Sequence, residues 1–300
     1  MNVDDMTLGG SLADVAASAA AAEARGYDGW LVSETSHDPF LACTLAAEHT
    51  ERLDIGTAIA VAFSRSPMHV AYLAHDLQVY SGGRFLLGLG SQIKAHVTNR
   101  FSAEWSAPAA RMREYFQALQ AIWRAWNEGE RLVFRGEFYR HTLMTPFFAP
   151  DPSPYGPPKV YLAAVGPKMT EVAGEVADGL LCHSFTTEHY LRTSTLPALR
   201  RGAAAAGRSL DDVDVNLGVF VVTGRDEQEQ ARVARGVRSQ IAFYGSTPAY
   251  RRVLDAHGWG ELQDQLYGLS LQGAWDEMAD RVPDEVVEAF AVVAEPDQVG

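Results

Sequence analysis

The sequence predicts an α/β protein, a (β/α)8 TIM barrel with an insertion after its fourth strand and extra helices between strands 7 and 8. Apolar segments typical of buried strands alternate with helical segments, and the first four strands begin 25, 26 and 31 residues apart. Such a repeat demands parallel strands joined by right-handed crossovers. Eight of these units within 300 residues favour a barrel, with a doubly wound open sheet as the alternative.

The first half of the chain repeats the strand and helix pattern most clearly. Proline suits the first turn of a helix, and glycine suits the position just past its end. Pro39 and Pro67 begin two of the expected helices. Gly26 follows the helix expected at 12–25, and Gly82 and Gly83 follow the helix expected at 67–81. We expect strands at residues 2–8, 27–33, 53–63 and 84–90, and helices at 12–25, 39–50 and 67–81.

The third of these strands differs from the others at its far end. Residues 58–62, Ala-Ile-Ala-Val-Ala, place bulky side chains among small ones, with no alternation of polar and apolar residues. Small side chains would let a flat ligand lie against the backbone. The alternative is an alanine-rich strand that is buried between large neighbours.

After residue 90 the regular pattern is interrupted and then resumes. A polar loop leads to a helix at 109–127 whose aromatic residues recur at helical spacing, and an insertion at about 129–158 contains a short hairpin around Gly136. The remaining strands are expected at 159–165, 179–183, 213–223 and 286–294, with helices at 167–177 and 188–206 and two or three helices within 226–280. An eighth helix would only begin at 296–300, so either it is absent or the sequence is cut there.

Composition excludes several classes of function. The net charge of −13 at pH 7 and the lack of a basic cluster argue against binding to nucleic acid or to an acidic membrane surface. No apolar segment reaches the length that a membrane-spanning helix needs. Cys43 and Cys182 lie far apart in apolar segments, without a secretory signal. We therefore expect a cytoplasmic protein with two reduced cysteines.

Polar residues follow the predicted strands at the end where a barrel carries its functional site. After the fifth strand, Gly166 and Pro167 open a helix whose free amides and Lys168 would suit one phosphate group, although an ordinary helix start with a solvated lysine is an equal alternative. The polar segments that follow the strands are 33–38, 64–66, 90–96, 165–168, 183–184 and 223–225.

Metal and serine chemistry are the competing interpretations of these strand ends. Glu34, His37, Asp38, His96 and His183 are possible ligands, but no two of them share a strand at the spacing that metal sites use. A serine nucleophile is still more strongly disfavoured than a metal site, because the Gly-x-Ser-x-Gly turn is missing. We predict no metal site.

Four segments in this order and spacing resemble the bacterial luciferase-like barrels, particularly the branch that uses the deazaflavin coenzyme F420. They are GYDGWLVSETSHDPF, LDIGTAIAVAFSRSP, GGRFLLGLGSQ and VYLAAVGPKMTEVAGEVADGLL. The resemblance covers nearly the whole chain and implies a single domain over residues 1–300. It also implies a small-molecule substrate and a homodimer or larger assembly.

The resemblance also implies roles for residues at the strand ends. A cis peptide bond between Ala58 and Ile59 would press Ile59 against the coenzyme ring, and Glu34 would lie near the pyrimidine edge of the ring. The remaining implied contacts are Gly90, Ser91 and Gln92 with the ribityl chain, Val165 and Gly166 with the phosphate, and Arg65, Lys94 and Lys168 as balancing charges.

The chain departs from the sugar-phosphate dehydrogenases of this family at the residues that exchange protons. Those enzymes have an Asp-His pair after strand 2 and a Glu after strand 4, whereas this chain has Glu34-Thr35 and Gln92-Ile93. His37 or His96 is therefore the expected proton donor or base, because imidazole exchanges protons near neutral pH, and Glu34 is the third catalytic candidate.

Three functions follow from these expectations. The first is an oxidoreductase that transfers a hydride between F420 and a small organic substrate, beneath a lid formed by residues 101–105 and the insertion. The second is an FMN-dependent monooxygenase supplied by a separate reductase. The third is a non-catalytic flavin-binding barrel. No residue pattern identifies the substrate.

Overall fold

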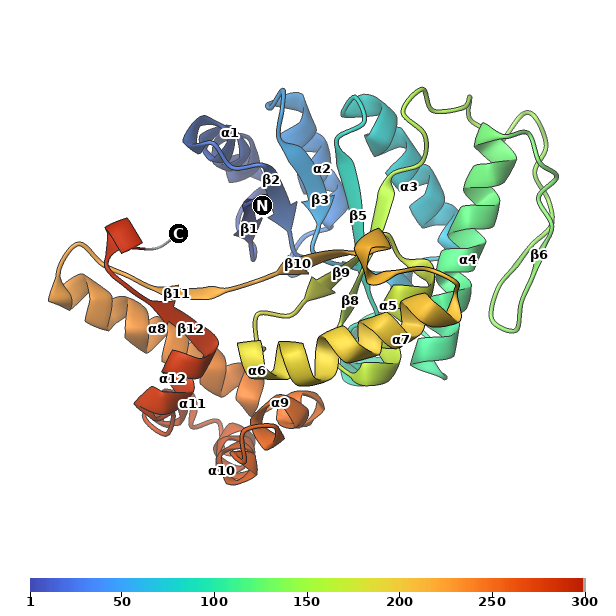
Figure 1. Ribbon diagram of the computed structural model, residues 1–300. Helices are drawn as coiled ribbons and strands as arrows, with labels where there is room; N and C mark the ends of the chain where they lie inside the picture. Colours follow the sequence, from blue (N-terminus) through green and yellow to red (C-terminus); the bar gives the residue numbers. More distant parts are fainter. Residues whose placement is uncertain (299–300) are drawn as a thin grey trace.

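The molecule is built on a curled parallel sheet, seen in a computed structural model that describes residues 1–298 (Figure 1). The sheet runs in the order β1-β2-β3-β5-β8-β9-β10, and the short strand β4 also pairs with β5. These strands are β1 (Asp4–Thr7), β2 (Gly29–Val32), β3 (Asp54–Thr57), β4 (Ala60–Val61), β5 (Phe85–Gly90), β8 (Lys159–Ala164), β9 (Gly179–Cys182) and β10 (Asp214–Leu217).

Helices that connect the strands cover the outer face of this sheet (Figure 1). Two of them begin with a proline that follows a capping side chain: Asp38 accepts the amide of Phe40, and Ser66 accepts the amide of His69. The helices are α1 (Val15–Arg25), α2 (Pro39–Glu48), α3 (Pro67–Tyr80), α4 (Pro108–Asn127), α5 (Pro167–Val176), α6 (Glu188–Tyr190) and α7 (Leu196–Ala205).

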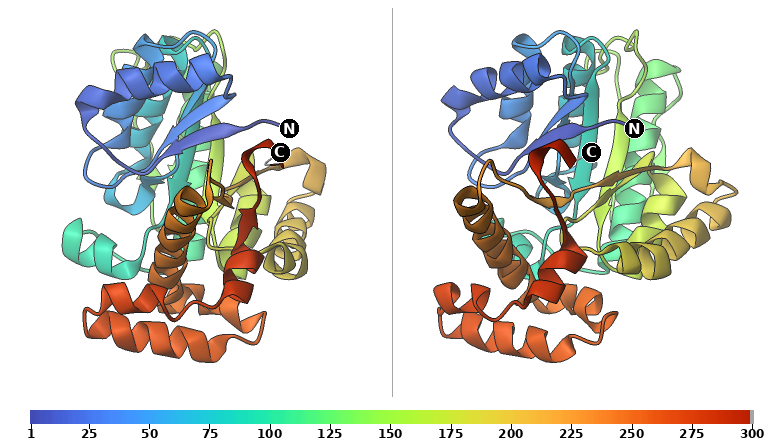
Figure 2. Two further views of the ribbon diagram at one scale, coloured as in Figure 1. Left: turned by 90° about the vertical axis from the view of Figure 1, so that its left-hand side faces the viewer. Right: turned by 60° about the vertical axis from the view of Figure 1, so that its left-hand side comes forward.

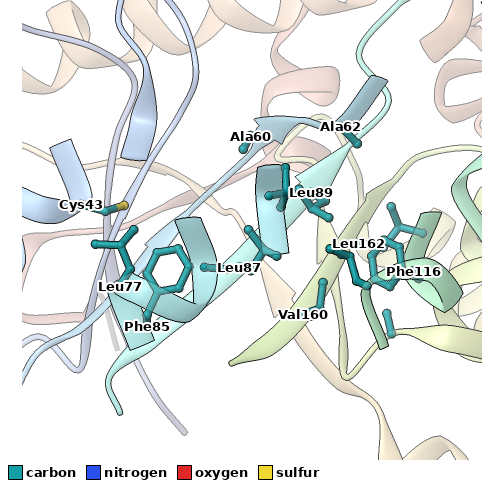
Figure 3. Close-up of a cluster of buried hydrophobic side chains, with 14 of the residues drawn as sticks. Cys43, Ala60, Ala62, Leu77, Phe85, Leu87, Leu89, Phe116, Val160 and Leu162 are labelled. Carbon is teal, nitrogen blue, oxygen red and sulfur yellow. The ribbon is translucent and has the colours of Figure 1, made fainter. Parts of the chain in front are cut away.

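The larger hydrophobic core lies between the sheet and these helices. Leu87, Leu89 and Leu162 are fully buried there and point to one side of their strands (Figure 3). Because side chains alternate along a strand, Gly88, Gly90 and Ala163 point to the other side. Near the carboxyl ends of β5 and β8, the concave side of the sheet therefore carries small residues that leave space for a cavity.

A second core lies in the C-terminal part of the chain. Phe185 and Phe290 are buried in it, with ring centroids 4.6 Å apart. Figure 2 shows α8 to α11 gathered at one end of the molecule in both views. The elements of this part are β11 (Phe220–Val222), α8 (Glu227–Gly245), α9 (Arg251–Asp255), α10 (Gly260–Leu271), α11 (Trp275–Ala279), α12 (Asp284–Phe290) and β12 (Ala291–Val293).

Three sequence predictions are wrong in this part. The strand expected at 213–223 is divided at Gly218 into β10 and β11, and β11 pairs in parallel with β12. Most of the strand expected at 286–294 is helix α12, because Pro283 precedes two acidic residues that stabilise the first helical turn. Within 226–280 there are four α-helices instead of two or three.

Side chains bridge the two edges of the curled sheet. No backbone pairing joins β10 to β1 within residues 1–298. The amide nitrogen of Asn216 on β10 donates to the Asp4 carboxylate on β1 at 2.6 Å. Burial raises the pKa of Asp4 despite this hydrogen bond, and neighbouring Asp28 raises it further.

The insertion contains the expected hairpin. Strands β6 (Phe134–Arg135) and β7 (Arg140–His141) pair antiparallel, and the carboxylate of Glu114 accepts the amides of residues 137–139. Cys43 and Cys182 are both free, as predicted. In residues 1–298 no helix is long and apolar enough to cross a membrane.

Candidate functional site

One cavity of about 2550 Å³ occupies the concave side of the sheet. It lies against the carboxyl ends of the strands and continues to their amino ends, where Asp4, Asp54 and Lys159 line it. Small residues near the carboxyl ends of β5 and β8, Gly90 and Ala163, contribute to this space. A large cavity that meets polar groups at the carboxyl ends of parallel strands is the expected site of a barrel.

The cavity brings together most of the residues nominated from the sequence. Arg65 and His37 are outside its lining, as is Lys94. The nominated residues that line it are Glu34, Ala58, Ile59, Gly90, Ser91, Gln92, His96, Val165, Gly166 and Lys168.

The peptide bond between Ala58 and Ile59 is cis, as the resemblance implied. The end of β2 holds this segment: the Ser33 hydroxyl donates to the Ala58 carbonyl at 2.6 Å, and the Glu34 amide donates to the Ile59 carbonyl at 3.1 Å. The side chain of Ile59 lines the cavity beside Gly90. The site therefore has an apolar wall where a flat ring was expected.

Glu34 and Arg65 form a buried ion pair beside this wall. One Glu34 oxygen accepts hydrogen bonds from the Val61 amide and from an Arg65 nitrogen, both at 2.7 Å. Arg65 also donates a hydrogen bond to the Asp38 carboxylate at 2.8 Å. Burial alone would lower the pKa of Arg65, but its bonds to the two carboxylates raise the pKa overall. Arg65 thus pairs with two carboxylates of the β2 loop and lies outside the lining of the cavity.

The two histidines nominated for proton exchange are placed differently. His96 begins a short π-helix, His96–Arg100, and lines the cavity while remaining exposed to solvent. His37 is exposed on the β2 loop outside the lining. Within residues 1–298, no three His, Cys, Asp or Glu side chains are grouped to hold a metal ion.

Helix α5 begins at the cavity without a side chain to cap it. Gly166 is its N-cap residue, has extended backbone angles and lines the cavity together with Val165 and Lys168. A Cβ atom added at Gly166 would meet nothing within 4 Å. Uncapped amides, a lysine and open space together fit a phosphate group.

The lining of the cavity also contains residues that sequence reasoning did not assign. His183 follows β9, and its ring lies 4.6 Å from Tyr244 and 4.8 Å from Tyr250, measured between ring centroids. His183 had been considered only as a possible metal ligand. The two tyrosines belong to α8 and to the 3-10 turn Pro248–Tyr250, which no strand-end rule could have identified.

The fold and the cavity define a barrel protein with a ligand site at the carboxyl ends of its strands. The chain belongs to the luciferase-like monooxygenase family, whose family model matches residues 2–300.

Relatives support this assignment. An uncharacterized protein of Mycobacterium tuberculosis is 52% identical over 295 residues, which cover 98% of this chain and 87% of that protein. An F420-dependent glucose-6-phosphate dehydrogenase of Mycobacterium avium is 32% identical over 211 residues, 65% of this chain and 60% of the relative. The solved structure of the coenzyme F420-dependent tetrahydromethanopterin reductase of Methanopyrus kandleri has a TM-score of 0.80 at 22% identity, covering 100% of this chain and 87% of that one. The predicted fold class is therefore confirmed.

Proposed function

We propose that this protein is an oxidoreductase that transfers a hydride between the deazaflavin coenzyme F420 and a small organic substrate. The observation that carries the proposal is the apolar wall of Ile59 beside Gly90, which faces the cavity at the carboxyl ends of the strands. Two relatives that are named for different substrates are both named as F420-dependent enzymes. That agreement favours F420 and leaves the substrate open.

The residues present fit such a coenzyme. Ile59 would lie behind the ring, Ser91 and Gln92 beside the ribityl chain, and Gly166 with Lys168 at the phosphate. When bound, the deazaflavin supplies a ring carbon that accepts or gives a hydride. The acidic chain would balance the coenzyme's negative charge through the amides of α5 and through Lys168.

The segment between β5 and α4 is suited to exclude water from the site. Arg100 donates to the Thr35 carbonyl and so ties this segment to the β2 loop. Trp105 packs edge-on against Phe63, with ring centroids 5.8 Å apart. These contacts support the role of residues 101–105 as part of a lid.

His96 is the preferred proton-exchange residue, because it lines the cavity and His37 does not. Glu34 is disfavoured for this role because one of its two carboxylate oxygens already accepts hydrogen bonds from Arg65 and the Val61 amide. In steady-state turnover, His96→Ala should lose at least ten-fold in rate, and His37→Ala should stay close to wild type. The reverse result would return the assignment to the β2 loop.

Coenzyme titration tests the proposed function directly. F420 and FMN are added separately while absorbance and melting temperature are recorded, and we expect F420 alone to change both. Lys168→Ala should weaken F420 binding about three- to ten-fold, the range expected for one exposed cation at a phosphate. Arg200→Ala removes an equally exposed charge outside the cavity and should leave the affinity unchanged.

An FMN-dependent monooxygenase is the second candidate, and the description of the matching family favours it. The wall at Ile59 and the start of α5 would serve FMN equally, because both coenzymes have a flat ring and a phosphate. Tight FMN binding with none for F420 would establish this alternative. Binding of F420 without oxidation of its reduced form by any enone, imine or alcohol in a broad panel would favour a non-catalytic barrel.

We also propose a homodimer or a larger homo-oligomer. Sedimentation equilibrium of the full chain measures the assembly directly, and a monomer at all concentrations would contradict it.

A further inference from the structure

His183 lines the cavity directly after the end of β9. Four consecutive residues at the end of β9 line the cavity: Leu181, Cys182, His183 and Ser184. Leu181 pairs with Ala163 on β8, and Ala163 in turn lies beside Gly90. The cavity thus extends continuously from Ile59 across β5 and β8 to His183.

One hydrogen bond fixes the tautomer of His183. Its Nδ1 lies 2.9 Å from the backbone nitrogen of Phe185, which donates the proton. The proton of a neutral ring must therefore be on Nε2. Within residues 1–298 this Nε2 has no hydrogen-bond partner and is not fully buried. Because His183 lines the cavity, its N–H is available to a ligand there.

The surroundings of the ring are aromatic and carry no charge near neutral pH. Burial lowers the pKa of His183 to about 4, and burial raises the pKa values of Tyr244 and Tyr250. Cys182, its neighbour in sequence, also has a pKa raised by burial. Phe243 extends the aromatic surface of this wall and is half exposed.

One cation lies at the edge of this region. Arg252 lines the cavity, is exposed to solvent and has no ion pair among residues 1–298. Its attraction for a bound anion would be screened by water. A neutral donor enclosed by aromatic rings favours an uncharged acceptor, because a buried anion would need compensating charge or several donors.

We propose that the Nε2–H of His183 donates a hydrogen bond to the carbonyl oxygen of an uncharged aromatic aldehyde or ketone, whose ring lies against Tyr244 and Tyr250. This inference rests on the proposed function and names the class of its substrate. His183 is then a specificity-determining residue that selects neutral carbonyl compounds over carboxylates and phosphates.

Two probes of equal shape and different charge test this inference on the full chain without coenzyme. Acetophenone presents a neutral carbonyl on a benzene ring, and benzoate presents a carboxylate on the same ring. Binding is followed by ligand-observed NMR and by the ¹⁵N signals of His183. We expect acetophenone to shift the Nε2–H signal and to bind at least ten-fold more tightly than benzoate.

Variants of His183 separate donation from packing. His183→Phe keeps an aromatic ring without a donor and should weaken acetophenone binding about ten-fold. His183→Gln replaces the donor with a side-chain amide and should recover the affinity to within three-fold. Near-UV circular dichroism of each variant confirms that the aromatic wall is still packed, and only variants that pass are compared.

Several outcomes would overturn the inference. They are equal acetophenone affinity in wild type and His183→Phe, tighter binding of benzoate, no acetophenone binding up to its solubility, or a His183 ring that is protonated above pH 6. The F420 titration is separate from these measurements. Ketone binding without F420 binding would defeat the proposed function alone, and F420 binding without ketone binding would defeat this inference alone.

Discussion

The absence of a side chain at Gly90 gives the Ile59 side chain room to pack against β5. A Cβ atom at position 90 would lie 3.0 Å from both Cγ1 and Cδ1 of Ile59, closer than an ordinary contact. In Gly90→Ala we expect Ile59 to move into the space proposed for the ring. F420 affinity should fall about ten-fold, or about 1.4 kcal/mol, when measured by absorbance titration.

Gly236→Ala is the matched control for this substitution. Gly236 lies on the exposed side of α8, and a Cβ there would meet nothing within 4 Å. Alanine favours a helix over glycine by about 1 kcal/mol, so this variant should be slightly more stable and bind normally. If both variants kept wild-type affinity, the wall at Ile59 would not be where the ring lies.

His183 should make the stability of the protein depend on pH. Its pKa is lowered to about 4 in the folded state, from 6.5 in an unfolded chain. Between these values the unfolded chain binds a proton that the folded state does not bind, so stability falls as the pH falls from 6.5 to 4. The loss should reach about 3 kcal/mol at pH 4.

Urea unfolding of wild type and His183→Phe at several pH values isolates this effect. The difference in unfolding free energy between the two proteins should be constant above pH 7 and should shift in favour of the variant below pH 6. A difference that did not change with pH would mean that His183 takes up its proton as readily in the folded state as in the unfolded chain.

At the level of elements, the hairpin of the insertion is held by one carboxylate. Glu114 is 9% exposed and accepts the amides of Glu137, Phe138 and Tyr139 at 2.8, 2.8 and 2.5 Å. Glu114→Ala leaves these amides without their acceptor and should cost about 3 kcal/mol of unfolding free energy. Hydrogen exchange at residues 137–139 should accelerate.

Glu130→Ala provides the comparison for Glu114. Glu130 pairs with Arg124 on the surface at 3.4 Å, with both side chains about half exposed. An exposed pair of this kind contributes less than about 1 kcal/mol, so stability and exchange should change little. Equal effects of the two substitutions would show that the hairpin is held by other contacts.

Helix α4 and strand β12 show what sequence patterns can and cannot predict about elements. The aromatic and aliphatic residues of α4 recur at helical spacing, and the helix is found within one residue of its expected start. Residues 286–294 are rich in valine and read as a strand, yet the acidic residues after Pro283 begin a helix. The helix wins over β propensity there because the acidic residues suit its first turn and because Val286, Val287 and Phe290 bury one helical face in the second core.

At the level of the whole molecule, the two cores should respond separately to mutation. Phe290 is 5% exposed and packs against Phe185 in the second core. Phe290→Ala should cost about 3 to 5 kcal/mol, because the cavity left behind cannot fully collapse. Hydrogen exchange should accelerate in α8 and α12, while β5 and β8 keep their protection.

Leu271→Ala is the control in the same part of the chain. Leu271 is 72% exposed at the end of α10, so its truncation should change stability by less than about 0.5 kcal/mol. Uniform acceleration across both cores in Phe290→Ala would show that the molecule unfolds as one unit.

The sequence could predict the part of the site beside the larger core better than the part formed by the second core. The wall at Ile59 and the start of α5 follow strands whose ends are readable from the apolar pattern, so most of their residues were found. Tyr244 and Tyr250 reach the cavity from a helix and a turn of the second core, and only tertiary packing places them. The ion pairs of Arg65 with Glu34 and Asp38 could not be predicted from the sequence, because they depend on the path of the β2 loop.

Because residues beside both cores line the cavity, a bound ligand would connect the two cores through noncovalent contacts. Ile59 and Gly90 lie on the side of the larger core, and Tyr244 and Tyr250 lie on the side of the smaller one. A molecule that contacts both walls at 100 times its dissociation constant adds about 2.7 kcal/mol to the folded state. In calorimetry, two separate transitions of the free protein should merge into one at saturation, so that the ligand makes the chain melt as a single cooperative unit.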